Sequence, residues 1–238
     1  MPRAPMPLLA RALMTAGRLR RRRLRRRGEP AREALVRRYA PGRSFLDVGC
    51  MWNVHGGIAF LAEEAGATRV TGIDVMAPTP QFEAEHARRA SAVRFVRGDV
   101  HDPATVAEAG RHDVVWCSGV LYHVPDPVLT LRRLRELTGE TLLLSTETLP
   151  EVPGLPGACV LYPALDAAGR ADYAAVRSGE RLGVTTPFEP DAGYANWWWG
   201  ITPSALRGML AVAGLELLEL SDDPFHRTAI CRPAAIAK

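Results

Sequence analysis

The chain has 238 residues, of which 47% are apolar and 24% charged, and this is enough to bury one α/β core without requiring a second one. Its four cysteines show neither Cys-x-x-Cys nor Cys/His metal-binding spacing, so we expect reduced thiols, a cytoplasmic protein and no metal. No apolar run reaches the roughly 20 residues needed to cross a bilayer. The sequence leaves the oligomeric state open.

Residues 1–28 are predicted to form a basic arm. Residues 1–39 contain 13 arginines and only two glutamates, whereas the remaining residues include 17 basic and 24 acidic ones. Such an arginine block can bind RNA phosphates or anionic lipid headgroups by releasing counterions. The competing interpretation is a solvated tail, since blocks of like charge are commonly disordered. RNA and an anionic membrane surface are therefore alternative partners of the arm.

The residues after the arm, 29–238, are expected to form one domain of alternating strands and helices. Strands are predicted at 44–48, 69–74, 93–97, 113–117, 140–146, 215–220 and 228–231. Helices are predicted at 29–39, where the helix would cap the pocket, and at 56–65, 81–90, 103–109 and 127–137, with a last one opening at Pro203. This alternation indicates a doubly wound, mostly parallel, seven-stranded Rossmann-like α/β sheet. The Pro- and Gly-rich residues 148–200 are expected to form a lid insertion over the site.

The ends of the first two strands predict a site for a nucleoside-containing cofactor. Asp47 and Gly49 end the first strand, and Asp74 and Val75 end the second about 25 residues later, where a carboxylate can accept hydrogen bonds from ribose hydroxyls. The intervening loop starts at Cys50 and includes Gly56, but it lacks the three-glycine fingerprint that lets a pyrophosphate approach the backbone. The cofactor is therefore expected to be a nucleoside without a pyrophosphate.

The ends of the third and fourth strands add further candidate groups. Asp99 and Val100 follow the third strand, where a carboxylate acceptor and a backbone donor would suit an adenine edge. Ser118 ends the fourth strand and is expected to contact the same cofactor. Any Gly-Asp turn could explain Asp99 alone, so its assignment depends on the first two strand ends.

With these strand ends in place, residues 40–147 resemble the class I S-adenosylmethionine-dependent methyltransferases. The resemblance implies S-adenosylmethionine as the cofactor. The Val-Leu-Tyr-His stretch at 120–123, residues 131–137 and residues 201–206 further resemble the tRNA wobble-uridine carboxymethyltransferase branch and its small-molecule-methylating relatives, and this resemblance spans about residues 44–147 and 196–230. In that branch the residues matching Tyr122 and Arg227 help hold a carboxylate on a modified cofactor. The branch also uses an N-terminal lysine, whereas Lys238 is the only lysine of this chain, which favours unmodified S-adenosylmethionine.

Candidate catalytic and acceptor-binding residues lie near the fourth strand and in the insertion. His123 is the candidate general base, with Tyr122 beside it, because a neutral imidazole is available near pH 7. A structural histidine bonded to a carbonyl of the lid is the equal alternative. Trp197, Trp198 and Trp199 are consecutive, so we expect one or two to line the acceptor site and one to pack in the core.

The predicted function is S-adenosylmethionine-dependent methyl transfer to a small-molecule hydroxyl or amine, by in-line displacement with proximity and assistance from a His base. One alternative is an RNA methyl- or carboxymethyltransferase, which the arm favours and the acidic body and missing lysine disfavour. An alternative of another class is a non-catalytic cofactor-binding regulatory or scaffold protein.

Overall fold

A computed structural model describes residues 32–176, 186–223 and 225–235, so the basic arm predicted at 1–28 lies outside the described residues. The main-sheet strands are β1 (Ser44–Val48), β2 (Arg69–Asp74), β3 (Arg94–Arg97), β4 (His112–Ser118), β5 (Thr138–Glu147), β8 (Leu215–Leu220) and β9 (His226–Pro233). The helices around this sheet are α2 (Arg32–Tyr39), α3 (Gly57–Glu64), α4 (Pro80–Arg89), α5 (Pro103–Ala109), α6 (Pro127–Leu137) and α8 (Pro203–Val212). Each was predicted within a few residues of these bounds.

The seven strands form one sheet in the order β3-β2-β1-β4-β5-β9-β8. β9 runs antiparallel to β5 and β8, and the other neighbouring strands are parallel. This confirms the doubly wound, mostly parallel sheet. β1 pairs in parallel with both β2 and β4, so the strand order reverses between β1 and β4. In a doubly wound sheet the ligand crevice lies at this reversal, beyond the carboxyl ends of the strands.

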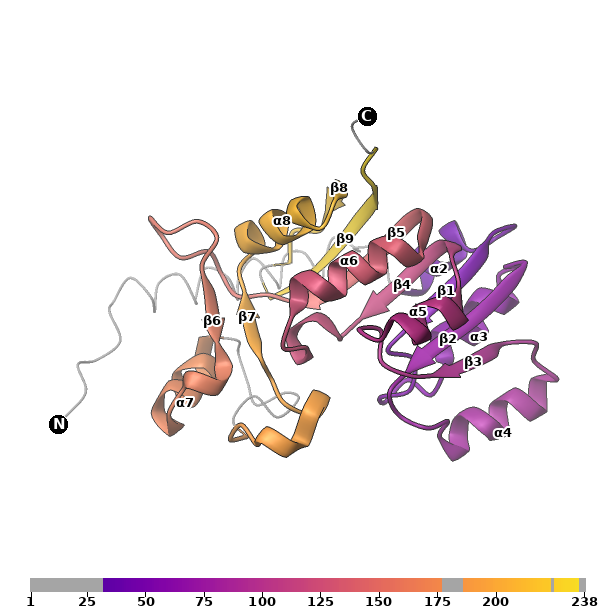
Figure 1. The fold of residues 1–238 in the computed structure, drawn as a ribbon, viewed down its shortest axis with the longest axis horizontal. Helices are drawn as coiled ribbons and strands as arrows, with labels where there is room; N and C mark the ends of the chain where they lie inside the picture. The colour runs from indigo at the N-terminus through magenta and orange to yellow at the C-terminus, as the bar shows by residue number, and fades with distance from the viewer. Residues whose placement is uncertain (1–31, 177–185, 224, 236–238) are drawn as a thin grey trace.

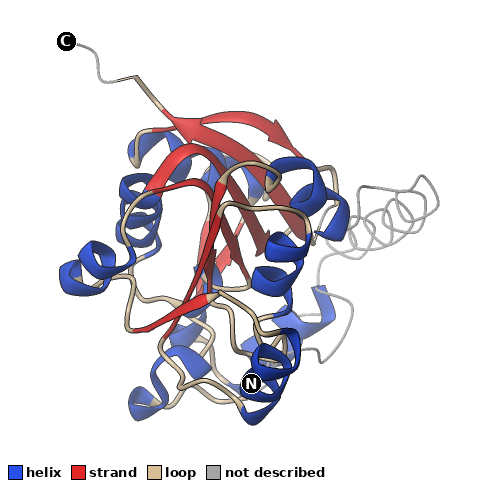
Figure 2. Cartoon of the chain, turned by 90° about the vertical axis from the view of Figure 1, so that its right-hand side faces the viewer, coloured by secondary structure: helices blue, strands red, loops and turns tan. Residues whose placement is uncertain are grey.

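Helices cover both faces of the sheet, as Figure 2 shows. On one face, α5, α6 and α8 pack against a core that includes Leu46 and Val48 of β1. On the other face, α2 and α3 pack against a core that includes Phe45 of the same strand. Adjacent residues of β1 thus face opposite layers, as the pleat of a strand requires. Figure 1 shows α6 and α8 lying across the first of these faces.

Four of the helices begin with the same sequence device, a capping side chain followed by proline. The side chains of Thr79, Asp102, Asp126 and Thr202 accept hydrogen bonds from backbone N–H groups of the first turns of α4, α5, α6 and α8. Proline is favoured at the next position because its fixed φ suits a helix and its missing N–H is not needed there. These short signals explain why the helix starts were predictable.

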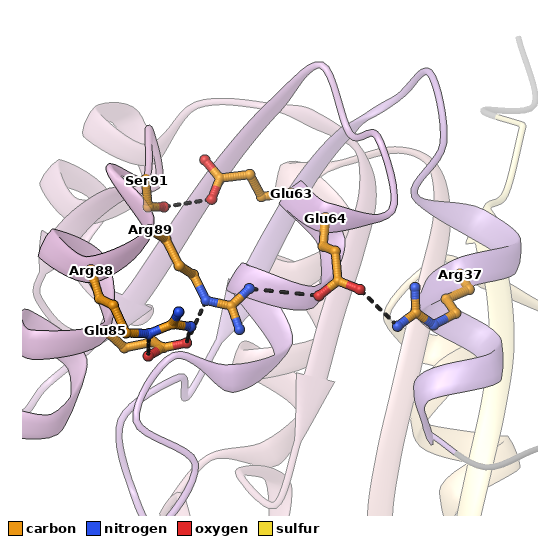
Figure 3. A network of polar contacts seen from close by, with 7 residues as sticks. All are labelled: Arg37, Glu63, Glu64, Glu85, Arg88, Arg89 and Ser91. Atoms are coloured by element: carbon orange, nitrogen blue, oxygen red, sulfur yellow. Dashed lines mark hydrogen bonds and ion pairs between the residues drawn. The ribbon is translucent and has the colours of Figure 1, made fainter.

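Surface ion pairs join α2, α3 and α4 on the outside of the second face (Figure 3). Glu64 of α3 lies 3.0 Å from Arg37 of α2 and 3.6 Å from Arg89 of α4, and Glu85 pairs with both Arg88 and Arg89. The side chains are partly exposed, so each pair contributes little to stability. They join the C-terminal turns of α2, α3 and α4.

The residues expected to form a lid insertion have more regular structure than the sequence predicted. They form a two-stranded antiparallel sheet of β6 (Cys159–Leu161) and β7 (Trp199–Ile201), with α7 (Ala167–Val176) and the 3-10 segments η2 (Tyr162–Ala164) and η4 (Pro190–Ala195). Figure 1 shows β6, β7 and α7 beside the main sheet. A third apolar cluster, containing Tyr162, Tyr173 and Trp197, packs this unit onto Tyr122 after β4.

In the described part of the chain, no helix is both long and apolar enough to cross a membrane. No group of three or more His, Cys, Asp or Glu side chains suited to a metal ion occurs among the same residues.

A buried histidine anchors the start of β4. The His112 ring lies 2.9 Å from the Gly110 carbonyl oxygen through Nδ1 and 3.1 Å from the Thr71 hydroxyl through Nε2. The carbonyl can only accept, so Nδ1 carries the proton and Nε2 accepts from the hydroxyl. Burial lowers the pKa of His112 from 6.5 to about 4, because charging the ring would cost hydration.

This histidine should weaken the fold in acid. Between pH 6.5 and 4 the unfolded state binds a proton at His112 that the folded state does not, so its contribution is complete above pH 6.5 and is lost as the pH falls to 4. We expect the melting temperature of His112→Gln to fall less steeply than that of the wild type across this window. Thermal scans at several pH values would measure the difference, and parallel curves would contradict it. Only the difference between the two proteins reports on His112, because other buried groups titrate in both.

Candidate functional site

A cavity of about 710 Å³ lies at the carboxyl ends of β1, β2, β3 and β4. Its size is that of a site for a small organic molecule or cofactor. The strand ends contribute Asp47, Gly49, Asp74, Val75, Asp99, Val100 and Ser118, all of which were predicted to bind the cofactor. Tyr122 and His123, the predicted catalytic residues, line the same cavity.

The carboxylate of Asp74 organises the loop after β1. Its Oδ2 accepts a hydrogen bond from the Met51 N–H at 2.7 Å, and its Oδ1 accepts one from the Met76 N–H at 2.9 Å. Burial raises the pKa of Asp74, and these backbone donors oppose that rise. Each carboxylate oxygen has a second lone pair, so Asp74 can hold the loop and still accept hydrogen bonds from a diol.

The loop itself does not need the glycines of a dinucleotide fingerprint. Met51 is fully buried in the core under α3, so its side chain points away from the cavity. Asn53 and His55 adopt left-handed backbone conformations, with φ of 55° and 48°. Asparagine tolerates this region better than most residues, and Asn53 is one of the loop residues that line the cavity. Gly49 has a φ of 80°, and a Cβ there would lie 2.5 Å from Val120.

Asp47 is the most unusual group of the wall. It is 2% exposed, and its Oδ2 has no hydrogen-bond partner among the described residues. Burial and the nearby Asp74 raise the pKa of Asp47 to about 7, against a backbone hydrogen bond from Ala59 and the charge of Arg32. A buried carboxylate without a partner is costly unless a cationic group pairs with it. The amino group of a methionine-derived cofactor would supply such a charge, so Asp47 fits S-adenosylmethionine.

At the opposite end of the cavity, Asp99 is held by two donors. The His101 N–H donates to Oδ1 at 2.8 Å, and the Tyr194 hydroxyl donates to Oδ2 at 2.5 Å. Tyr194 belongs to η4 of the insertion and also lines the cavity. The insertion thus contacts the end of the cavity where an adenine was predicted.

Tyr122 and His123 form a short 3-10 turn after β4 (η1, Leu121–His123). The Tyr122 ring stacks on Trp197 with centroids 4.3 Å apart. His123 Nδ1 lies 2.6 Å from the carbonyl oxygen of Asn196, so the ring nitrogen is the donor. This contact is the one expected of a structural histidine that bonds to a carbonyl of the lid. The contact is also compatible with His123 as a general base, because a neutral ring protonated at Nδ1 carries its lone pair on Nε2.

Two predicted cofactor-binding residues lie behind the wall. Cys50 is fully buried beneath Gly72, where a Cβ would lie 2.8 Å from its sulfur. Gly56 is the N-cap of α3 and has a φ of 74°. Both shape the loop through backbone contacts, including the bond from the Gly56 N–H to the Cys50 carbonyl at 2.7 Å. Neither residue lines the described cavity wall, and their contact with the cofactor stays a prediction.

The three tryptophans do not belong to the described wall of the cavity. Trp197 is buried in the third cluster, Trp198 packs edge-on against Phe188, and Trp199 donates from Nε1 to the Pro125 carbonyl at 3.0 Å. Trp197 packs in a core as expected, and the prediction that one or two of the three line the acceptor site stays a prediction. Trp197 and Trp199 attach the insertion to residues after β4, whereas Trp198 packs within the insertion.

Arg227 also lies outside the described cavity wall. It is on β9 opposite Thr146 of β5, and its guanidinium donates to the Ser221 carbonyl and lies 3.4 Å from Asp222. The pairing of Arg227 with Tyr122 on a cofactor carboxylate, which the resemblance implies, therefore gains no support from these contacts, because the guanidinium is directed to the β8–β9 connection.

Sequence reasoning missed several wall residues, among them Arg32, Trp52, Val54, Ile58 and Tyr194. Arg32 opens the predicted capping helix, so its place in that helix was the available signal. Trp52 remains 60% exposed at the cavity, and a large exposed apolar side chain cannot be recognised from sequence alone. Tyr194 reaches the wall only through the fold of the insertion.

A protein-family model and curated relatives that match this chain are all methyltransferases. A family model described as "Methyltransferase domain" matches residues 46–139. A protein from Nitrosospira multiformis named ubiquinone biosynthesis O-methyltransferase is 30% identical over 195 residues, which cover 80% of this chain and 71% of that protein. A protein of the same name from Burkholderia thailandensis is 25% identical over 191 residues, covering 80% and 72%.

Solved structures share the fold at low sequence identity. The N-terminal domain of EvdMO1 with SAH bound matches with a TM-score of 0.57 and 19% identity, covering 87% of this chain and 82% of that one. The Burkholderia thailandensis 1,6-didemethyltoxoflavin-N1-methyltransferase, with 1,6-didemethyltoxoflavin and S-adenosylhomocysteine bound, matches with a TM-score of 0.56 and 18% identity, covering 98% and 94%.

Asp47 should make cofactor binding depend on pH. A ligand ammonium pairs with the ionised carboxylate, so binding below pH 7 must first remove a proton from Asp47. We expect the affinity for S-adenosylhomocysteine to fall by up to about tenfold per pH unit below pH 7 and to level off above it. Calorimetric titration from pH 5.5 to 8.5 would measure this dependence.

In Asp47→Asn the affinity should be lower and nearly independent of pH. Asp113→Asn is the matched control, because Asp113 bonds to Ser44 at the other end of β4, away from the cavity. An unchanged slope in Asp47→Asn would contradict the role given to this carboxylate.

Proposed function

This chain belongs to the class I S-adenosylmethionine-dependent methyltransferases, and from this premise we propose that it methylates a hydroxyl group of a small molecule. The observation that carries the proposal is His123, which lines the cavity and donates from Nδ1 to the Asn196 carbonyl. The names of the related O-methyltransferases support the same acceptor chemistry. The acceptor would approach beside Tyr122 and Ser118, past the end of β4.

The wall residues have separate tasks in holding the cofactor. Asp74 and Val75 would hold the ribose, Asp99 and Val100 the adenine, and Asp47 the ammonium of the methionine part. When bound, S-adenosylmethionine supplies a methyl group activated by its sulfonium. The protein then contributes alignment and exclusion of water, since an in-line displacement depends chiefly on the placement of donor and acceptor.

A hydroxyl acceptor adds one requirement, which is the removal of its proton. The His123 ring donates through Nδ1 to the Asn196 carbonyl, and this bond fixes the ring while Nε2 accepts the proton. As Nε2 becomes protonated, the charge spreads over a ring whose Nδ1–H already has an acceptor. The same carbonyl therefore serves the neutral and the protonated histidine.

The alternatives fit the described residues less well. In the carboxymethyltransferase branch, Tyr122 and Arg227 would hold one carboxylate, but Arg227 engages Ser221 and Asp222 instead. An RNA acceptor was inferred from an arm that lies outside the described residues. An amine acceptor needs no base, and it remains the alternative that the next experiment separates.

The test uses S-adenosylmethionine with an isotopically labelled methyl group. The protein is incubated with a metabolite extract passed through a filter that retains macromolecules, and in parallel with total RNA. We expect label in a low-mass product that mass spectrometry identifies as a methyl ether or ester. Label on nitrogen would replace the hydroxyl by an amine acceptor, and label in RNA alone would overturn the small-molecule proposal.

Replacement of His123 tests the base. His123→Ala should lower turnover by roughly 10²- to 10⁴-fold, the usual contribution of a positioned base, while cofactor affinity stays nearly constant. His55→Gln is the matched control, because His55 bonds to Thr79 and lies outside the described cavity wall. Turnover that survives in His123→Ala would leave an amine or an already ionised acceptor held by proximity.

A further inference from the structure

A short turn of the insertion is closed on itself by one buried side chain. Asn196 is 6% exposed, and its Oδ1 accepts from the Glu189 N–H at 3.0 Å. Its Nδ2 donates to the Glu189 carbonyl at 2.7 Å and to the Gly193 carbonyl at 3.2 Å. The two ends of residues 189–196 are thus joined by side-chain bonds, and η4 between them moves as one unit. We call these residues the Asn196 turn.

One end of the cavity is reached from this turn by Tyr194. Its hydroxyl donates to Asp99 across 95 positions of sequence, and its ring lies edge-on to His101. Burial, followed by the hydrogen bond to Asp99, raises the pKa of Tyr194 well above its usual range, so the phenol remains a donor at neutral pH. Together with the His101 N–H, it fixes the plane of the Asp99 carboxylate, which keeps lone pairs for a further donor.

The other end of the cavity is reached by the backbone of the same turn. The Asn196 carbonyl accepts the Nδ1–H of His123 at 2.6 Å, and the Trp198 N–H donates to the Tyr122 carbonyl at 2.8 Å. Asn196 of the turn and Trp198 just after it are therefore both bonded to η1. The tautomer of the candidate base depends on where the Asn196 turn sits.

We propose that the Asn196 turn is a positioning element that couples the two ends of the cavity. Tyr194 orients Asp99 toward the amino group of the cofactor's adenine, and Asn196 holds His123 with its lone pair on Nε2. The proposal rests on the proposed function, because it takes the cavity as the cofactor and acceptor site. Coupling between sites is reciprocal, so a ligand that engages Asp99 also stabilises the arrangement of His123.

The adenine end is tested by binding alone. Calorimetry compares S-adenosylhomocysteine with S-inosylhomocysteine, in which a carbonyl oxygen replaces the adenine amino group and would face the Asp99 carboxylate. The wild type should prefer the adenine ligand, and Tyr194→Phe should reduce that preference about tenfold, the loss expected when one buried hydrogen bond no longer orients the acceptor. Tyr39→Phe is the matched control, since Tyr39 is on α2 outside the described cavity wall.

The coupling is tested by the nitrogen NMR signals of His123 in protein labelled at histidine. The wild type should show the tautomer protonated at Nδ1, and S-adenosylhomocysteine should strengthen that signal. In Tyr194→Phe the ligand should no longer change it. In Asn196→Ala the tautomer should become mixed, because the side-chain bonds that hold the Asn196 carbonyl in place are lost. The His55 signals, which report a separate bond to Thr79, provide an internal reference.

The outcomes separate the two proposals. If the wild type binds S-adenosylhomocysteine but Tyr194→Phe retains both the adenine preference and the His123 response, the coupling is refuted and the proposed function stands. If the wild type binds neither nucleoside, the cavity is not the cofactor site and both proposals fail. Melting temperatures of the variants distinguish a loss of coupling from a loss of folding, because unfolding would reduce the affinity for both ligands alike.

Discussion

Two buried carboxylates at the ends of neighbouring strands constrain the whole site. Asp47 and Asp74 lie on β1 and β2, and burial together with the charge of Asp74 disfavours ionisation of Asp47. Asp74 is compensated by N–H groups of Met51 and Met76, which fixes the loop between β1 and α3. Asp47 lacks such compensation at Oδ2. The described residues leave this pair short of positive charge, and a cationic cofactor would remove the deficit.

This constraint explains why the loop departs from a glycine-rich pattern without losing its function in the fold. Anchored to Asp74, the chain turns through left-handed conformations at Asn53 and His55 and buries Met51 under α3. Bare backbone is needed where a pyrophosphate approaches a helix, but a carboxylate that pairs with an ammonium acts through a side chain. The sequence difference between the two loop types therefore reflects a difference in the charge of the ligand.

The sequence predicted the parts of the site that depend on strand ends. Asp47, Asp74 and Asp99 each follow a short apolar run, and parallel strands bring such ends to one edge whatever the loops do. It did not place Cys50 and Arg227 away from the described cavity wall, because their directions depend on loop twist and on the register between β5 and β9. Side-chain direction within an irregular segment is set by packing partners distant in sequence, which periodicity does not record.

Side-chain directions in the insertion were likewise not predictable from the sequence. Three consecutive tryptophans suggested an aromatic clamp, yet Trp197 and Trp199 attach the insertion to Tyr122 and Pro125, and Trp198 packs on Phe188 within it. Gly200 of β7 shows how tightly the insertion is packed, since a Cβ there would lie 2.6 Å from the Tyr173 ring. A well-packed unit of this kind holds its loops in place. The apolar core of the insertion therefore holds in place the polar contacts that the insertion makes with the cavity.

Those polar contacts bear on the choice between hydroxyl and amine acceptors. A neutral amine attacks with its own lone pair and loses its proton after transfer, so it gains little from a fixed imidazole. A hydroxyl is a poor nucleophile until its proton leaves, so it gains from a base held in one tautomer. The chain uses the Asn196 carbonyl to determine that tautomer and three side-chain bonds to hold Asn196 itself. Ordering these groups costs conformational entropy, which an amine methyltransferase would have no chemical reason to incur at this position.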